Sequence, residues 1–438
     1  MTANEQFEDA PIRIVREIMD LVRAEAEPQF QKYLVWERES PTTWRGSWED
    51  RPAPPKCLRT VDWKQYGDRL QVSFRTRYPG LPNMVGTGVT GWYRLTADRL
   101  LSSIVFELCR RHPDLGIDDH CVADFAEELE TLLTAKEVSF EFVAPLINFD
   151  MEDGFDSVDL KGGLQLIRMT SEQVSTIYGG SELLLGMRGR TSPVPCALTG
   201  TFSEPVCGND DRVDSYFDTD LRPRLDLIVL GLQIFKPAAV ALDGAHMTCK
   251  SYSPLVLAES SIFAADAYVP TDGYCLTADE CESLKDHLAM FVREPHPVLK
   301  IACSRYGSAV VRRTAADRLL DAIVGLEAVL LHDAGAPKER GELSFRLAVR
   351  YATLVAQASD RKCAYRTMKD LYNARSRVVH GGDAGKSFDI GGQKLSPDEV
   401  AVKARDILRE VILAFLPDGP QPRFVHQGFW DDQLFGDR

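Results

Sequence analysis

The sequence predicts an α+β N-terminal region followed by an all-α helical bundle. The first 275 residues mix short alternating stretches with helical patterns, and from about residue 276 the apolar residues follow helical spacing almost throughout. The chain has 438 residues, of which 44% are hydrophobic and 26% charged, which is typical of globular proteins. We therefore expect an α+β region over 1–275, a bundle over 276–418 and a C-terminal tail over 419–438.

Each element of the N-terminal region is predicted from its own pattern. An apolar stripe from Ile12 to Val22 indicates a helix over 11–33, and the proline-rich polar stretch 39–56 indicates a loop. A capping-box pair, Thr170 and Gln173, marks the start of a helix over 171–178. The pattern at 221–235 fits a helix or a buried strand. Further helices are expected at 97–111 and 122–136, and strands at 70–74, 138–143, 158–167 and 197–202.

The C-terminal part reads as a series of amphipathic helices. Thr277 with Glu280 and Ser396 with Glu399 have the spacing of capping boxes that begin the first and last of them. Helices that are apolar on one side only must pack against each other, which predicts a bundle. Aromatic residues in the tail, Phe424, Trp430 and Phe435, are expected to fasten it to the body or to another subunit. The predicted helices cover 278–292, 296–311, 314–332, 341–358, 361–380 and 397–416.

Charge and composition exclude several classes of protein. The net charge of −14 excludes binding of nucleic acid by the whole surface, because phosphate binding needs clustered Lys and Arg. Residues 279–438, with 24 basic and 23 acidic residues, are the better place for a local polyanion site. No apolar run is long enough to span a membrane, the N-terminus does not resemble a secretory signal, and ten cysteines contain no C-x-x-C. A cytoplasmic location with free thiols is expected.

One constellation carries the functional prediction. Arg375 is followed after four residues by His380, and Gly381 and Gly382 come next. His380 is expected in the last turn of its helix, where the carbonyl end favours an imidazolium. The two residues lie about 140° apart on one helix, so they meet only if two copies of the helix form a shared cleft across a two-fold axis. A guanidinium that binds phosphate and a histidine that moves a proton suit metal-free RNA cleavage through the 2′-hydroxyl.

This stretch resembles the R-x4-6-H signature of the HEPN superfamily. More narrowly, residues 276–416 resemble the Apea-like HEPN group of bacterial proteins, through RLLDAIVGLEAVLL (318–331), ELSFRLAVRYATLV (342–355) and LYNARSRVVHGG (371–382). The resemblance covers about a third of the chain. It implies a homodimeric, metal-independent endoribonuclease acting in antiviral defence or a toxin-like response, with Arg375 and His380 as the catalytic pair. It gives no partner for the N-terminal region, which we expect to recognise a signal.

Three further residues are assigned supporting roles. Ser376 follows the arginine where nucleolytic members commonly carry Asn, Asp or His, and serine supplies neither a second charge nor a proton-transfer group. Glu327, polar on an otherwise apolar helix face, is a candidate to orient Arg375, and Lys386 to assist phosphate binding. In the alternative interpretation, Arg375 only pairs with Asp370 or Glu327, and His380 only caps its helix. The competing function is then a non-catalytic sensor or scaffold that binds a nucleotide, nucleic acid or protein.

No cofactor or metal site is predicted. Gly86 to Gly91 match G-x-G-x-x-G, but a dinucleotide loop needs a strand before it and a helix after it, and neither pattern is present. The segment from His112 to Cys121 is interpreted as a polar loop, because adjacent residues rarely converge on one metal ion.

Overall fold

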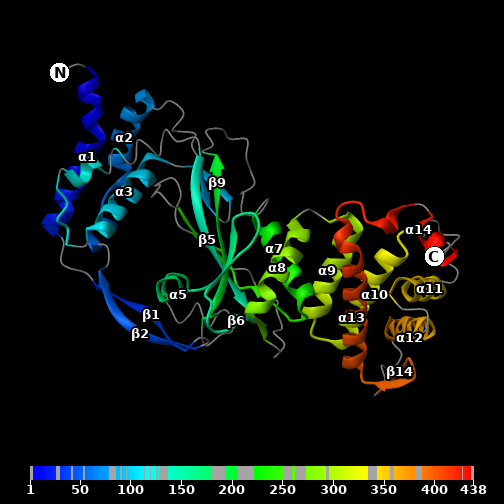
Figure 1. The fold of residues 1–438 in the computed structure, drawn as a ribbon. Coiled ribbons are helices and arrows are strands. Elements are labelled where there is room, and N and C mark those ends of the chain that lie inside the picture. The colour runs from blue at the N-terminus through cyan, green and yellow to red at the C-terminus, as the bar shows by residue number, and fades with distance from the viewer. Residues whose placement is uncertain are drawn as a thin grey trace. The chain divides into compact units, whose positions relative to one another are not determined.

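The protein has α+β character and divides into two compact units (Figure 1). Unit 1 contains Met1–Pro145, Gly163–Pro223 and Asp243–Ala264, and unit 2 contains Leu146–Gly162, Arg224–Leu242 and Ala265–Arg438. The computed structural model describes residues 3–25, 30–40, 43–52, 55–77, 85–88, 91–94, 96–112, 114–118, 120–124, 127, 137–179, 193–205, 221–249, 259–261, 273–292, 295–333, 343–355, 360–379, 387–426 and 428–435.

Three helices of unit 1 lie at its N-terminal end: α1 (Ala3–Glu25), α2 (Trp63–Arg77) and α3 (Ala97–Arg111). Helix α3 confirms the predicted bounds, whereas the helix predicted over 11–33 begins earlier and ends at Glu25. The strand predicted at 70–74 was wrong, because this segment lies within α2. Helix α2 packs closely on α3, since a Cβ on Gly67 would lie 2.7 Å from the backbone nitrogen of Asp98.

A two-stranded hairpin replaces both the end of the predicted first helix and the predicted loop over 39–56. Strands β1 (Phe30–Ser40) and β2 (Thr43–Pro52) pair antiparallel. Trp36 and Trp44 are buried on one face, and the backbone N–H of Trp36 donates to Oγ of Ser175 at 2.9 Å. The loop prediction failed because it weighed the polar residues and prolines, whereas burial of the two tryptophans decides the structure.

The main sheet of unit 1 is antiparallel, with strand order β12-β11-β5-β9-β8. Its strands are β5 (Glu137–Ile147), β8 (Leu164–Arg168), β9 (Cys196–Pro205), β11 (Ala245–Cys249) and β12 (Glu259–Ser261). Strands β5 and β9 confirm the predictions at 138–143 and 197–202. The strand predicted over 158–167 is divided, because Gly162 and Gly163 adopt positive φ (85° and 75°) in a turn between β7 (Ser157–Asp159) and β8.

The short helix α5 (Ser171–Tyr178) follows β8 and confirms its predicted bounds. Its capping box is complete: Gln173 N donates to Oγ1 of Thr170, and Thr170 N donates to Oε1 of Gln173. The helix predicted over 122–136 is described only in part, with residues 120–124 helical.

Unit 2 is built mainly from helices around one hydrophobic core. The segment that fitted either a helix or a strand is helix α7 (Arg222–Phe235). Helix α10 packs against α9, α12 and α13, and α11 packs against α12 (Figure 1). These helices lie within a few residues of the predicted ranges, and Ser396 and Glu399 form the predicted capping box. The bounds are α8 Cys281–Val292, α9 Pro297–Val311, α10 Ala315–Leu330, α11 Leu343–Val355, α12 Arg361–Val379 and α13 Pro397–Phe415.

Short elements complete the two units. In unit 2, β6 pairs parallel with β13, β10 pairs with Leu146 and Ile147 at the end of β5, and β14 and β15 form a hairpin that was not predicted. Their bounds are β6 Phe149–Met151, β10 Ala241–Leu242, β13 Tyr274–Leu276, β14 Phe388–Ile390 and β15 Gln393–Leu395. The other short elements are β3 Val85–Gly88, β4 Gly91–Arg94, η1 Lys56–Arg59, η4 Ala278–Glu280, η6 Leu416–Asp418, η7 Arg423–Val425 and α14 Phe429–Phe435.

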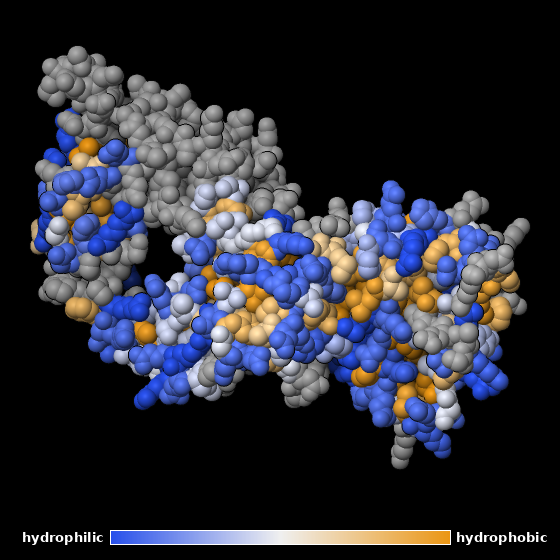
Figure 2. All heavy atoms as spheres, viewed as in Figure 1, coloured by the Kyte–Doolittle hydropathy of each residue, from blue (hydrophilic) through white to orange (hydrophobic). Residues whose placement is uncertain are grey.

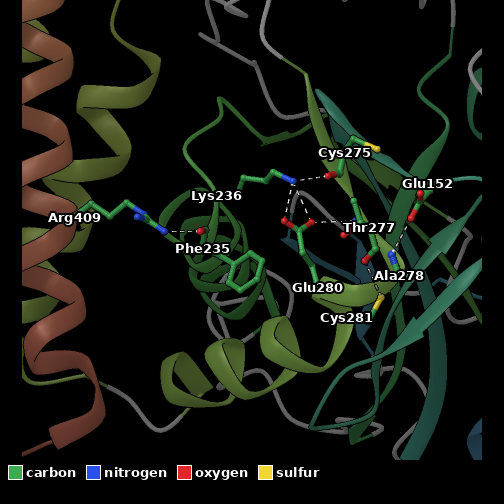
Figure 3. Close-up of polar contacts among 9 residues, drawn as sticks. All are labelled: Glu152, Phe235, Lys236, Cys275, Thr277, Ala278, Glu280, Cys281 and Arg409. Carbon is green, nitrogen blue, oxygen red and sulfur yellow. Dashed lines mark hydrogen bonds and ion pairs between the residues drawn. The ribbon is translucent and has the colours of Figure 1, made fainter.

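Unit 2 is not the continuous segment 276–418 that the sequence predicted. It also includes residues 146–162 and 224–242, because α7 packs closely on α8: a Cβ on Gly231 would lie 2.6 Å from the side chain of Leu288. Lys236, just after α7, donates to both carboxylate oxygens of Glu280 at 3.0 Å and to the carbonyl of Cys275 at 2.8 Å (Figure 3). Arg409 of α13 donates to the carbonyl of Phe235 (Figure 3).

The predicted tail also belongs to this core. Phe424 is fully buried against Phe415, and Trp430 is 3% exposed, so both fasten the C-terminal segment to the body, whereas Phe435 is exposed. Among the described residues, no helix is both long enough and apolar enough to cross a bilayer. On the face seen in Figure 2, hydrophobic residues form patches among hydrophilic ones.

Candidate functional site

Arg375 lies near the C-terminal end of α12, at the edge of its buried face. Met368, Leu371 and Ala374 form that face and are completely buried in the core of unit 2. The side chain of Arg375 is 29% exposed, so the guanidinium is held near the core while one side of it still meets solvent.

Glu327 of α10 is the nearest carboxylate to Arg375. Its Oε1 lies 3.9 Å from Nη2 of Arg375, which is an ion pair but exceeds hydrogen-bonding distance. Glu327 therefore lies close to Arg375, as the sequence predicted. The alternative partner, Asp370, instead accepts a hydrogen bond from the backbone N–H of Gly391 at 3.0 Å, next to β14.

Tyr372 joins these two residues and was not among the predicted site residues. The guanidinium of Arg375 lies 5.7 Å from the centre of the Tyr372 ring, a cation–π distance. Tyr372 is also close enough to Glu327 for each group to influence the pKa of the other. Residues three apart are neighbours on a helix, so the spacing of Tyr372 and Arg375 was the signal that could have revealed it.

The surroundings raise the pKa of both Glu327 and Tyr372. Burial raises the pKa of Glu327, although Arg375 and Tyr372 act in the opposite direction. Burial also raises the pKa of Tyr372, and the neighbouring Glu327 carboxylate adds to this effect. A carboxyl group with a raised pKa beside a cation is a common feature of functional sites, and it also occurs in structural ion pairs.

Arg375 retains unused hydrogen-bonding capacity. None of the described residues accepts a hydrogen bond from its guanidinium, and its Nε is buried without an acceptor. By contrast, Arg350 of α11 donates to both carboxylate oxygens of Asp333, at 2.6 and 2.8 Å, and to the carbonyl of Leu330. A guanidinium with free parallel N–H groups can bind a phosphate in bidentate fashion.

The other predicted site residues are placed only in part. Ser376 follows Arg375 on α12 and is half-buried. His380 and Lys386 lie outside the described residues, so the structure brings together Arg375 and Glu327 but does not describe the Arg–His arrangement.

The segments considered and set aside as nucleotide or metal sites have their own structures. Gly86 and Gly91 belong to the antiparallel hairpin of β3 and β4. In the polar segment, the backbone N–H of Cys121 donates to Asp118, and His120 pairs with Asp124 at 2.9 Å. Within the described ranges, no three His, Cys, Asp or Glu side chains are grouped so that they could hold a metal ion.

Comparison with known proteins finds no similar protein. No protein-family model, no curated protein and no solved structure matches the chain.

Proposed function

We propose that the protein is a metal-independent endoribonuclease in which Arg375 and His380, from two copies of an HEPN-like bundle, act on one RNA phosphate. The proposal is supported mainly by the surroundings of Arg375 and by its unused hydrogen-bond donors. Arg375 is held between Glu327 and Tyr372, it is partly exposed, and it donates no hydrogen bond to any described residue. Arg350 of the same unit, by contrast, donates three hydrogen bonds, to both carboxylate oxygens of Asp333 and to the carbonyl of Leu330.

The chemistry follows from the two residue types. Neutral His380 removes the proton of the ribose 2′-hydroxyl, and the 2′-oxygen forms a bond to phosphorus. Arg375 stabilises the negative charge that develops on the non-bridging oxygens. The bond between phosphorus and the 5′-oxygen breaks, and a protonated His380 of the second copy returns a proton to that oxygen. The products are a 2′,3′-cyclic phosphate and a 5′-hydroxyl.

The proposal is tested by RNA cleavage in excess EDTA. We expect the wild-type protein to generate cyclic phosphate ends, and Arg375→Ala and His380→Ala each to lose at least about 100-fold in rate. Arg313→Ala and His426→Ala are matched controls, because both residues are exposed in the same unit. Equal activity of all five proteins would exclude the site. A substrate with 2′-deoxyribose at the cleaved position should be inert.

A second candidate function is binding without cleavage. It is favoured by the Arg375–Glu327 ion pair, which gives the arginine a partner within its own chain, and by the serine at 376. In that case the bundle is a sensor or scaffold for a nucleotide, nucleic acid or protein. Retained RNA binding with no cleavage, in EDTA or in Mg²⁺, would favour this function. A role in bacterial antiviral defence or a toxin-like response is part of the same proposal, and growth arrest on expression, lost in Arg375→Ala, would support it.

A further inference from the structure

Helix α12 has an exposed face on which four cationic residues line up. Lys362, Arg366, Lys369 and Arg377 are all exposed, and we call them the basic stripe. At about 100° per residue they fall within an arc of about 80°, and they extend over about 22 Å of the helix. Asn373, also exposed, occupies the gap between Lys369 and Arg377.

No described carboxylate neutralises the basic stripe: none lies within 4.0 Å of any of its four cationic groups. Some other arginines of unit 2 are paired, as the exposed Arg305 and Arg312 are with Asp321. Like charges three and four positions apart destabilise a helix, yet α12 concentrates them in a chain of net charge −14. This arrangement favours an anionic partner over a purely structural role.

Aromatic side chains border the stripe. The ammonium group of Lys369 lies 5.9 Å from the centre of the Tyr365 ring, and the guanidinium of Arg377 lies 4.4 Å from that of Phe388. Phe345 of α11 is 51% exposed and meets Tyr365 edge-on, with ring centres 6.1 Å apart. An exposed aromatic ring beside a row of cations is the combination that binds single-stranded nucleic acid, because cations contact phosphates and rings stack on bases.

We infer that the basic stripe binds the phosphate backbone of single-stranded RNA and that Phe345 and Tyr365 stack on its bases. The surface is distinct from the candidate site, because Arg375 lies about 120° round α12 from Lys369 and faces Glu327. The inference rests on the proposed function in one respect, since it takes RNA as the ligand. It does not require cleavage.

The test is equilibrium binding of a fluorescent single-stranded 2′-O-methyl RNA, which has no free 2′-hydroxyl, to the full chain over a range of salt. Each phosphate contact with a single strand contributes about 0.7 to the slope of log K against log salt. We therefore expect Lys362→Gln/Arg366→Gln/Lys369→Gln to lower the slope by about 2 and the affinity at 0.1 M salt by about 100-fold. Phe345→Ala should weaken binding by about tenfold and leave the slope unchanged.

A matched control is available in unit 1. Lys56, Arg59 and Lys64 are two lysines and one arginine, exposed and without a described carboxylate within 4.0 Å, so their replacement by Gln removes the same charge. This variant should bind like the wild type. The charge-preserving variant Lys362→Arg/Arg366→Lys/Lys369→Arg should also bind like the wild type, which separates loss of charge from loss of folding.

Three outcomes would overturn the inference: no salt-dependent binding by the wild type, equal losses in the stripe and control variants, or displacement of the RNA by polyglutamate at equal charge concentration, which would indicate an acidic protein partner. Failure of the proposed function looks different. If binding depends on the stripe but no RNA is cleaved, the nuclease proposal is wrong and the binding surface stands. If RNA is cleaved but binding does not depend on the stripe, the binding surface is wrong and the nuclease proposal stands.

Discussion

Nη2 of Arg375 lies 3.9 Å from Oε1 of Glu327, so the two side chains attract each other without a hydrogen bond. Tyr372 is near both groups: the Arg375 guanidinium lies 5.7 Å from the centre of its ring, and the tyrosine influences the pKa of Glu327. This geometry keeps Arg375 in place and leaves its donors available. An incoming phosphate can therefore bind the guanidinium without first breaking a hydrogen-bonded ion pair.

Replacement of Glu327 by Gln should change how stability depends on pH. Because burial raises the pKa of Glu327 in the folded state, the wild type loses stability as the pH rises through that pKa. The uncharged Gln lacks this loss, so the free energy of unfolding of Glu327→Gln relative to wild type should increase between pH 4 and pH 7. Urea unfolding at the two pH values measures it. A difference that decreases with pH would mean that attraction to Arg375 outweighs burial.

His287 gives a prediction of acid sensitivity. This buried ring lies between Phe235 and Phe291, with Nε2 3.1 Å from the carbonyl of Gly231, and burial lowers its pKa to about 4. Its folded-state pKa is below the unfolded value, so its contribution is present above pH 6.5 and is lost as the pH falls toward 4. The loss is expected to reach about 2–3 kcal/mol.

His287→Gln keeps a hydrogen-bond donor but does not titrate. Between pH 7 and pH 4, its free energy of unfolding, measured with urea, should therefore fall by about 2–3 kcal/mol less than that of the wild type. His426→Gln, at an exposed position, is the control and should follow the wild type. Parallel pH profiles for wild type and His287→Gln would contradict the prediction.

The sequence predicted local features well and long-range packing poorly. The capping boxes at Thr170 and Ser396 predicted helix starts, because they depend only on residues three apart. The β1–β2 hairpin was missed because its strands are stabilised by contacts with Ser175, more than a hundred residues away. The boundaries of unit 2 were missed for the same reason: α7 joins it through residues such as Leu288 and Glu280, which no local pattern connects to it.

At the candidate site, the pairing of Arg375 with Glu327 could be anticipated because a polar residue on an apolar helix face needs a partner in the core. The contact of Tyr372 with Arg375 could be anticipated from their spacing of three residues, whereas its proximity to Glu327 depends on how α12 packs against α10. The basic stripe was present in the sequence as spacing alone. Its exposure and lack of partners became evident only when the packing of α12 showed which face is buried.

Lys236 is expected to stabilise unit 2 through Glu280. Burial opposes ionisation of Glu280, but the backbone N–H of Thr277 and the Lys236 ammonium outweigh it and lower its pKa. Lys236→Met should therefore lower the free energy of unfolding by about 1 kcal/mol at pH 7, and the cost should shrink as the pH falls through the lowered pKa of Glu280.

The matched control is Lys285→Met, which removes a surface pair with Glu282 of 2.7 Å and should cost less than Lys236→Met. Chemical unfolding of the two variants makes the comparison, and equal costs would show that the contacts of Lys236 in Figure 3 contribute no more than a surface pair.

Arg350 of α11 is expected to hold the C-terminal segment 416–435 in place through Trp430. It is 6% exposed, donates to Asp333 and to the carbonyl of Leu330, and lies 5.0 Å from the centre of the Trp430 ring. Arg350→Ala leaves Asp333 unpaired and the indole without its cation, and should cost about 3 kcal/mol. Arg350→Lys should recover only part of this, because an ammonium cannot make the forked contact.

Thermal unfolding measures how much stability Arg350→Ala loses, and limited proteolysis shows which part of the chain becomes accessible. We expect cleavage within 416–435 in Arg350→Ala under conditions in which wild type and the exposed control Arg313→Ala stay intact. If the segment stays protected in Arg350→Ala, the edge-to-face contact of Phe424 with Phe415, at 4.8 Å between ring centres, must hold it without the arginine. In that case Phe424→Ala, rather than Arg350→Ala, would release the segment.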